Sequence, residues 1–573
     1  MPGSSRRTAP DRYWMLLVCL ALSLTGLGLR VFWIQVVEAP AYAKKAADQR
    51  RRDMVITPKR GVIYDREGQP LAISTEARTI YAVPSAVRDP AAVAVRLAEV
   101  LGGKPADYEK RLRKRSSFVY IARKVELERA KRVEAMGIKG IAFLEDSERT
   151  YPSGELACQV LGFVGVDDKG LAGIEKQYDA VLAGKPGSVL AECDRFGRPI
   201  LGGVMRTVDK VDGHDIVLTI DKDIQYQAQV ELAATVQQFG ARAGSVLVMD
   251  PRDGGILAMA STPTFDPNDL KHADPKAFGN RPICQAYEPG STIKPFTAAA
   301  ALDKGVFKPD SKFDLPSTLT VGGRVIHEAH DRPNVEYTLT EIIANSSNIG
   351  AVKIGLALGK QSIYDYYTRF GLDAKTGVDF PGEARGDIPA PARWSASSIG
   401  NIPFGQGMTA TPLQIARALS AIAEGGESVT PHFLLSVPGQ ETTAWPKTRV
   451  ISAEAARQMT AVLERVVTNG TGTSARVAGY DVAGKTGTAQ VAKHGSYADG
   501  AYVASFVGFL PASDPRALIV VVIDEPTKGE YGGAVAAPMF SRLAQFTVDH
   551  LKIPPTVTAT KRPRAAAEAT AHD

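Results

Sequence analysis

The apolar residues near the N-terminus form one long run. No charged residue occurs from Tyr13 to Leu29, and Arg30 is the only charge before Val37. At about 1.5 Å per residue, a helix of this length spans about 37 Å, whereas the hydrocarbon core of a bilayer is about 30 Å thick. The run therefore predicts one membrane-spanning helix over residues 13–37.

A cleaved signal peptide is the alternative interpretation of this run. The run is longer than the apolar core of a signal peptide, and no small-residue cleavage site follows it. Arg6, Arg7 and Arg12 precede it, and positive charges favour the cytoplasmic side of a span. We therefore expect an uncleaved anchor with a cytoplasmic tail over residues 1–12. Everything from about residue 38 onward then lies outside the cytoplasm, in a compartment without ATP.

The pattern changes twice after the anchor. Residues 44–60 are rich in Lys and Arg and lead into two extended runs around a turn at residues 66–69. Residues 90–140 alternate apolar and charged residues at helical spacing, which predicts solvated helix faces and not a binding patch.

A second region begins near residue 240. Two apolar runs, at residues 245–249 and 256–260, flank a turn rich in Asp, Pro and Gly, as in a hairpin. Further along the chain, the patterns predict helices at 295–303, 341–358 and 412–424 and strands at 501–510 and 517–524. Helices between strands at both ends predict an α+β fold whose sheet is closed by distant segments. Residues 553–573 lack apolar periodicity and predict a disordered tail.

Composition adds mainly exclusions. The chain has 573 residues, too many for one domain, and its 44% hydrophobic and 23% charged residues are ordinary for folded protein. A net charge of +6 is weak evidence for nucleic-acid binding, and we expect no nucleic-acid partner.

The four cysteines exclude a disulfide scaffold and contain no C-x-x-C pair. Cys158 and Cys193 can pair in an oxidising compartment, but the sequence leaves this open. Cys284 has no functional interpretation, and we expect a small buried hydrophobic residue there.

Three short motifs carry candidate chemistry. Ser291 is the only serine with a lysine three residues later, Lys294, and Asn348 is the only asparagine with a serine two residues before it, Ser346. Pro289 and Gly290 precede Ser291, so Ser291 can open a helix and share one face with Lys294. A serine hydroxyl needs an adjacent base, and a lysine serves only when its pKa is lowered.

The remaining roles follow from residue chemistry. Ser346 can relay a proton, and Asn348 can hold Lys294 and a substrate amide. A Lys-Thr-Gly triplet occurs at Lys375 and again at Lys485, and the second is followed by a run typical of a strand. Lys485 can be the second cation that lowers the pKa of Lys294. Four further groups complete the predicted site: Thr486 and Thr488, which can bind a carboxylate, Gly487, which permits close approach of a peptide, and the backbone N–H groups of Ser291 and Thr488, which can form an oxyanion hole.

Two other patterns in the sequence compete with this interpretation. Residues 479–486 fit the P-loop pattern, but a P-loop requires a helix after its lysine, and here a strand is expected. His327 and His330 lack a third ligand nearby, so a polar surface loop is favoured and no metal is expected. The absence of a G-x-S-x-G elbow argues against an α/β-hydrolase triad.

The chain resembles class B penicillin-binding proteins, which are peptidoglycan D,D-transpeptidases. The resemblance rests on segments from the anchor to about residue 550: RGVIYDREGQPLA from residue 60, GLAGIEKQYDAVLAGKPG from 170, EPGSTIKPF from 288, NSSNIG from 345, FGQGMTATPLQIARA from 404 and AGKTGTAQ from 483. The segment KGEYGGAVAAPMF, from residue 528, is more similar to the division-type branch than to the elongation-type branch.

The resemblance implies a fold and a domain order. They are a single transmembrane helix, a non-catalytic pedestal domain over residues 38–240, a transpeptidase domain over 241–552 with an antiparallel sheet flanked by helices, and the tail. It also implies cross-linking of stem peptides through a serine acyl-enzyme with release of D-alanine, in septal wall synthesis and without a cofactor. β-Lactams would be covalent inhibitors, and a polytopic membrane glycosyltransferase and other division proteins would be partners.

Other functions of the same fold stay open at this point. They are an elongation-type transpeptidase, a D,D-carboxypeptidase, a β-lactamase and a penicillin-binding sensor or scaffold. The long pedestal and the anchor disfavour the carboxypeptidase and the β-lactamase. A sensor would need an output module, and residues 1–12 are too short for one. The intact motif set disfavours a scaffold without activity.

Overall fold

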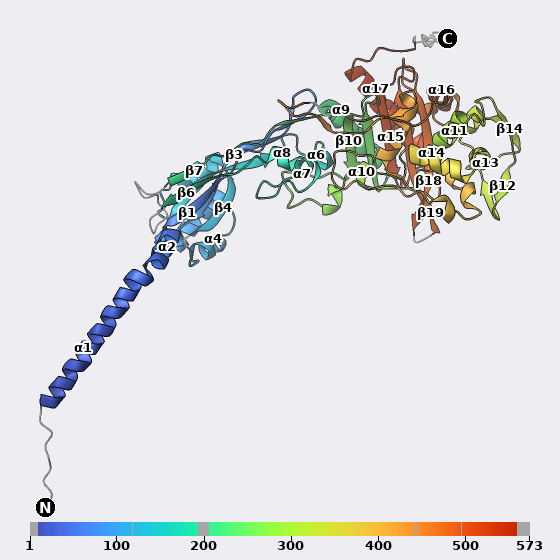
Figure 1. The fold of residues 1–573 in the computed structure, drawn as a ribbon. Coiled ribbons are helices and arrows are strands. Elements are labelled where there is room, and N and C mark those ends of the chain that lie inside the picture. The colour runs from blue at the N-terminus through green and yellow to red at the C-terminus, as the bar shows by residue number, and fades with distance from the viewer. Residues whose placement is uncertain (1–9, 117, 193–204, 442–443, 494–495, 558–573) are drawn as a thin grey trace, which may run out of the picture. The chain divides into compact units, whose positions relative to one another are not determined.

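The computed structural model describes the chain except for residues 1–9, 117, 193–204, 442–443, 494–495 and 558–573. Cys193 and most of the predicted tail therefore lie outside the described residues. The chain forms two compact units (Figure 1), which interleave in sequence. The smaller unit takes residues 1–59, 75–148 and 184–212, and the larger takes 60–74, 149–183 and 213–573. The predicted boundary near residue 240, between a pedestal domain and a transpeptidase domain that are each continuous in sequence, stays a prediction.

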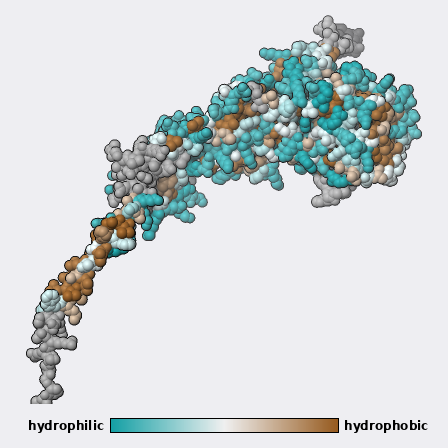
Figure 2. All heavy atoms as spheres, viewed as in Figure 1, coloured by the Kyte–Doolittle hydropathy of each residue, from teal (hydrophilic) through white to brown (hydrophobic). Residues whose placement is uncertain are grey.

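The smaller unit contains the apolar helix. Helix α1 spans Pro10–Phe32 and continues in a π-helical turn, Trp33–Val37. Residues Tyr13–Val37 are long and apolar enough to cross a membrane and are not buried inside the protein. Figure 2 shows apolar side chains along the visible face of this helix. The predicted bounds of the apolar helix are confirmed.

Two groups of strands and four helices make up the rest of the described part of this unit. Strand β4 corrects the sequence interpretation, because residues 90–140 were expected to be helical and instead place a strand between two helices. An apolar cluster that includes Ile80, Leu97 and Ile121 forms the core. The elements are α2 (Ala39–Arg50), β1 (Arg51–Ile56), α3 (Pro90–Leu101), α4 (Pro105–Leu112), β4 (Val119–Glu126), α5 (Leu127–Glu134), β5 (Ile141–Thr150), β6 (Gly187–Glu192), β7 (Met205–Val208) and the end of β3 (Pro70–Ala82).

A five-stranded antiparallel sheet organises the larger unit. Its strand order is β10-β9-β20-β19-β18, with bounds β9 (Ala243–Met249), β10 (Ile256–Thr262), β18 (Ala483–Lys493), β19 (Ser496–Leu510) and β20 (Ala517–Asp524). Strand β9 pairs with β20, from Leu518 opposite Met249 to Asp524 opposite Ala243. Segments more than 200 residues apart thus close the sheet. The predicted α+β class and its distant closure are confirmed.

Helices cover both faces of this sheet. In β20, Leu518, Val520 and Val522 join one apolar cluster, while the alternating residues Ile519 and Val521 join the other. This period of two follows from the pleat of a strand. The helices are α9 (Lys222–Phe239) and α17 (Gly532–His550) on one face, and α11 (Lys294–Asp303), α13 (Asn348–Leu358), α15 (Pro412–Ala423) and α16 (Ala453–Asn469) on the other.

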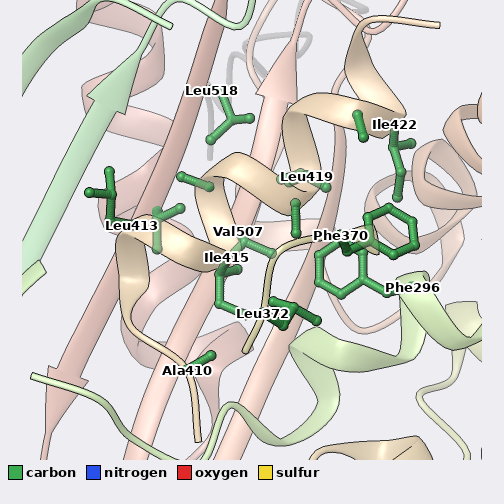
Figure 3. Close-up of a cluster of buried hydrophobic side chains, with 14 of the residues drawn as sticks. Phe296, Phe370, Leu372, Ala410, Leu413, Ile415, Leu419, Ile422, Val507 and Leu518 are labelled. Carbon is green, nitrogen blue, oxygen red and sulfur yellow. The ribbon is translucent and has the colours of Figure 1, made fainter. Parts of the chain in front are cut away.

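The second face carries the larger apolar cluster. Figure 3 shows Leu413, Ile415 and Leu419 of α15 in one cluster with Val507 and Leu518 of the sheet. Phe296 of α11 lies beside Phe370, with ring centroids 5.0 Å apart. This packing fixes α11, and therefore the lysine at its first position, against the sheet.

Short elements complete the larger unit. They are β2 (Ile63–Tyr64), α6 (Cys158–Leu161), α7 (Gly173–Gln177), α8 (Asp179–Leu182), β8 (Ile216–Leu218), α10 (Arg281–Cys284), β11 (Lys312–Leu315), β12 (Thr318–Val321), β13 (Arg324–His327), β14 (Val335–Thr338), α12 (Leu339–Ala344), α14 (Lys360–Arg369), β15 (Glu427–Ser428), β16 (Leu434–Ser436) and β17 (Thr448–Arg449).

A buried ion network joins two segments of the larger unit, residues 60–74 and 149–183. Arg60 donates from Nε to Glu175 Oε2 over 2.7 Å, and Arg149 donates from Nε to Glu175 Oε1 over 2.7 Å. Arg60 also reaches Asp179 Oδ1 over 2.7 Å. The side chain of Glu175 is 0% exposed, and each arginine side chain is 1% exposed. The network ties together the places where the chain passes between the two units in sequence.

Replacing Glu175 by glutamine tests this network. Removal of one partner from a buried ion pair leaves uncompensated charge, which costs about 3–5 kcal/mol. We expect Glu175→Gln to lower the thermal unfolding midpoint of the full-length protein in detergent. Glu67→Gln is the control, because the Glu67 side chain is 70% exposed. Equal midpoints for Glu175→Gln and the unsubstituted protein would contradict the role of the network.

Candidate active site

Ser291 lies in a tight turn before α11. The turn is a 3-10 helix, Gly290–Ile293, so the expected α-helical start is corrected to a 3-10 turn that leads into the α-helix. Side chains three residues apart eclipse in a 3-10 helix, which places Ser291 and Lys294 on one side. A Cβ at Gly290 would come within 3.3 Å of Thr488 O, so the turn packs closely against β18.

Lys294 is a buried lysine held by neutral oxygens. Its Nζ donates to Ser346 O over 2.5 Å and to Asn348 Oδ1 over 2.8 Å. The side chain of Lys294 is among those that are fully buried. Burial lowers the pKa of Lys294 to about 7, because an ammonium group away from water loses its hydration. A sizeable fraction of this lysine is therefore a neutral amine at physiological pH.

Ser346 interrupts the helix that was predicted over residues 341–358. That prediction is wrong, because α12 ends at Ala344 and α13 begins at Asn348. Ser346 adopts φ +56°, a left-handed conformation that costs about 1–3 kcal/mol for a residue with a side chain. The break directs the serine hydroxyl into the site: it accepts from Lys294 Nζ over 3.3 Å and from Lys485 Nζ over 2.8 Å.

Lys485 is the second buried lysine. It lies on β18, is 0% exposed and also donates to Thr486 O over 3.0 Å. Burial, and after it the charge of Lys294, hold the pKa of Lys485 well below the usual range of a lysine. The structure thus brings both lysines to one hydroxyl.

The residues after Lys485 form the edge of the five-stranded sheet. Thr486 Oγ1 and Thr471 Oγ1 lie 2.7 Å apart, and Thr488 Oγ1 accepts from Gly532 N over 3.1 Å. A Cβ at Gly487 would meet Thr292 Cγ2 at 2.8 Å, so only glycine allows the serine turn to approach the strand. The predicted strand is confirmed, and because a P-loop requires a helix here, it excludes that interpretation.

One cavity of about 720 Å³ joins these motifs. Among the residues named from the sequence, Ser291, Ser346, Asn348, Thr486 and Thr488 line it. Lys294 and Lys485 lie beneath this lining and reach it through Ser346.

Several lining residues were missed by the sequence analysis. His327, Glu328 and His330 were assigned to a surface loop, yet they line the cavity. Tyr531, directly before α17, also lines the cavity, and its ring is tilted against that of His330, with ring centroids 5.0 Å apart. In the sequence, only the spacing of Glu328 and Arg332, four residues apart and of opposite charge, indicates that this segment is ordered by an ion pair. Among the described residues, no group of three His, Cys, Asp or Glu side chains is arranged to hold a metal ion.

Two cysteines and the other Lys-Thr-Gly triplet lie elsewhere. Cys158 is buried, and its predicted pairing with Cys193 falls outside the described residues. Cys284 is exposed, so its interpretation as a buried hydrophobic residue is wrong. Lys375 is exposed on a loop in which Thr376 Oγ1 donates to Glu383 Oε1 over 2.6 Å, and it does not line the cavity.

This arrangement can support acyl transfer. Ser291 is half-buried and lines the cavity, three residues before the buried Lys294, and Lys485 shares the Ser346 hydroxyl with Lys294. The edge strand presents backbone and threonine hydroxyl groups that an extended peptide can bind. The N–H groups of Ser291 and Thr488 lie on two closely packed segments, where they can stabilise a developing oxyanion.

Comparisons with known proteins agree with this geometry. Residues 244–545 match the family model described as penicillin binding protein transpeptidase domain, and residues 55–218 match the penicillin-binding protein dimerisation domain. The chain is 36% identical to Stage V sporulation protein D of Bacillus subtilis, over 92% of this chain and 83% of that protein. It is 34% identical to peptidoglycan D,D-transpeptidase FtsI of Escherichia coli, over 96% of this chain and 93% of that protein.

A solved structure gives the same match in three dimensions. It is penicillin binding protein 3 of Mycobacterium tuberculosis in complex with aztreonam. The TM-score is 0.70 at 31% sequence identity, over 88% of this chain and all of that chain.

The two Lys-Thr-Gly triplets provide a matched test of the site. We expect Lys485→Ala to slow acylation by fluorescent penicillin about 10²–10³-fold, because one preorganised donor and its charge are lost. Lys375→Ala should change the rate little, since Lys375 lies on an exposed loop. The measurement is the second-order acylation constant of the full-length protein, with the unfolding midpoint of each variant as a check on folding. The reverse ranking would overturn the assignment.

Proposed function

The chain belongs to the penicillin-binding proteins that carry a dimerisation domain and a transpeptidase domain, and from this premise we propose that it is a septal peptidoglycan D,D-transpeptidase. One observation carries the proposal: Lys294 and Lys485 are buried around the hydroxyl of Ser346, in the cavity that Ser291 lines. This is the environment that a serine nucleophile requires for activation at neutral pH.

In the proposed first step, Ser291 attacks a stem peptide that ends in D-Ala-D-Ala. Its oxygen bonds to the carbonyl carbon of the penultimate residue, and neutral Lys294 accepts the hydroxyl proton. The N–H groups of Ser291 and Thr488 stabilise the oxyanion. The peptide bond then breaks, and the leaving amine of D-alanine takes up a proton delivered through Ser346. The product is an ester between the stem peptide and Ser291.

In the second step, an amine of a neighbouring stem peptide attacks this ester. The amine loses a proton to Lys294 as the new amide bond forms, and the proton returns to the Ser291 oxygen as the ester bond breaks. The enzyme is regenerated and two strands are cross-linked. A β-lactam enters by the same first step, but its ring-opened amine remains attached and the acyl group stays on Ser291.

Substrate binding is assigned to the edge strand. Thr486 and Thr488 hold the terminal carboxylate, and Lys485 supplies positive charge nearby. Gly487 lets the serine turn and the peptide approach the strand. Asn348, which already accepts from Lys294 Nζ, orients the donor amide. No cofactor or metal takes part in these steps.

The membrane arrangement is part of the proposal. Residues 13–37 anchor the protein in the bacterial inner membrane, with residues 1–12 in the cytoplasm and the catalytic domain in the periplasm or another extracytoplasmic space. The proposed domains are a pedestal over residues 38–240, a transpeptidase domain over 241–552 and a tail over 553–573. A polytopic membrane glycosyltransferase that polymerises the strands is the proposed partner, meeting the anchor and the pedestal together with other division proteins.

Covalent labelling and turnover test the function together. Full-length protein should bind fluorescent penicillin covalently and should release D-alanine from a D-Ala-D-Ala stem peptide while forming a cross-linked product. Ser291→Ala should abolish the label and the product, because it removes the nucleophile. In cells depleted of the protein, wild-type copies should restore division, whereas Ser291→Ala copies should leave filaments with blocked septa.

The alternative activities give different results in the same experiments. Release of D-alanine without a cross-linked product would indicate a carboxypeptidase. A label without any turnover would indicate a sensor or scaffold, and rounded cells with normal septa would indicate an elongation role. Labelling of Ser291→Ala would refute the assignment of the nucleophile.

The anchor gives a separate prediction about topology. A periplasmic-type phosphatase fused after residue 60 should be active, because arginines before the span hold the N-terminus in the cytoplasm. A reporter that works only in the cytoplasm should be inactive at the same position. Activity of the cytoplasmic reporter would refute the orientation.

A further inference from the structure

A buried carboxylate lies at the base of the cavity. The side chain of Glu328, just after β13, is only 7% exposed. It accepts three hydrogen bonds: from Ser347 Oγ to Oε1 over 2.5 Å, from Arg332 Nη2 to Oε1 over 2.5 Å and from Asn348 N to Oε2 over 2.7 Å. A carboxylate this deeply buried is costly unless it is paired and hydrogen-bonded, so each contact needs a physical role.

Two of these contacts stabilise the turn that carries the relay serine. Asn348 is the first residue of α13, and its backbone N–H is one of the groups that a helix start leaves unpaired. Ser347 Oγ caps the same helix by accepting from Gly350 N over 2.9 Å. Glu328 therefore holds both residues that follow Ser346, whose φ of +56° must be maintained by its surroundings.

The neighbouring backbone adds a second attachment. Asn348 Nδ2 donates to His327 O over 3.0 Å, while its Oδ1 accepts from Lys294 Nζ over 2.8 Å. The segment at 327–328 therefore orients both the backbone and the side-chain amide of Asn348. A displaced Glu328 would move the acceptor that holds Lys294.

The third contact determines the charge balance. Three cationic side chains belong to this region: Lys294 from α11, Lys485 from β18 and Arg332 from the loop after β13. Glu328 pairs with Arg332, and its charge acts on Lys294. Burial lowers the pKa of Lys294, and the negative charge of Glu328 opposes that shift. Arg332 is also held by Leu315 O over 3.2 Å and Pro333 O over 3.0 Å, so its guanidinium stays beside the carboxylate.

We propose that Glu328 is a positioning residue for acyl transfer, whose buried carboxylate keeps the Ser346–Asn348 turn in its strained shape and presents a negative charge to Lys294, with Arg332 as its counterion. The inference rests on the proposed function, because it concerns how that reaction is controlled. The hydrogen bonds of Glu328 go to Ser347, Asn348 and Arg332 and not to the proposed nucleophile Ser291, so it acts through Asn348, Ser347 and Lys294. The two effects, on shape and on charge, can be separated by substitution.

Glu328→Gln removes the charge and keeps the length. Since acylation needs neutral Lys294, its rate rises with pH through the pKa of that lysine. Without the carboxylate this rise should move by about one pH unit to lower pH. The maximal rate should also fall about tenfold, because the amide NH2 group must face one of the three donors that now bind the carboxylate.

Two other variants complete the design. Glu328→Asp keeps the charge but shortens the reach, so the rise should stay at the wild-type pH while the maximal rate falls about tenfold. Arg332→Gln removes the counterion and a repelling cation, so the rise should move to higher pH, opposite to Glu328→Gln. Glu336→Gln is the matched control, because Glu336 lies on β14 with its side chain 52% exposed and pairs with Lys312.

The measurement is the second-order acylation constant with fluorescent penicillin, from about pH 5 to about pH 9, on full-length protein in detergent. Opposite shifts for Glu328→Gln and Arg332→Gln support the proposal. Equal loss at every pH in all the variants would reduce Glu328 to a structural role and overturn it. Unfolding midpoints identify any variant that fails to fold. If the Glu328 variants do not fold, the direction in which Arg332→Gln moves the pH of the rate increase decides the question. Failure of the wild-type protein to label would instead refute the proposed function.

Discussion

Two lysine ammonium groups buried around one serine hydroxyl are the constraint on which the larger unit depends. Taking an ion out of water costs on the order of several kcal/mol, and here the partners of Lys294 and Lys485 are mainly neutral oxygens. Burial lowers the pKa of Lys294 to about 7, so this lysine avoids part of the cost by losing its proton. The same desolvation that destabilises the ammonium form favours the neutral amine that we propose as the base for Ser291.

The surrounding fold maintains this arrangement through close backbone approach. A Cβ at Gly532 would lie 2.3 Å from Gly487 O, so α17 begins directly against the lysine strand. Gly290 brings the serine turn to the same strand from the other side. The apolar clusters on both faces of the sheet hold these segments in place. The strained φ of Ser346 lies between two helices, α12 and α13, whose apolar residues pack in the same cluster.

The larger unit contains a contrasting solution to the same physical problem. In the network of Arg60, Glu175 and Arg149, buried charges are neutralised by opposite charges at 2.7 Å. That network holds two segments of the chain together, and its paired charges do not need to exchange protons for this role. At the active site, the excess of buried positive charge over negative leaves one lysine ready to give and take a proton. Burial alone therefore does not identify a functional charge, whereas the chemistry of its partners does.

The sequence by itself determined the local elements and the identity of the reacting groups. Apolar run length predicted the helix at residues 13–37, and a short continuous apolar run predicted the strand Ala517–Asp524. The short motifs at Ser291, Ser346 and Lys485 carried the resemblance that implied the chemistry. These features depend on neighbours within a few residues, which is why pattern reveals them. The tertiary structure alone decided the break at Ser346, the exposure of Cys284 and the place of Glu328. Each of these depends on how segments distant in sequence pack together. Burial and neighbouring charges, which local propensity does not encode, then determine the conformation and the protonation of a side chain.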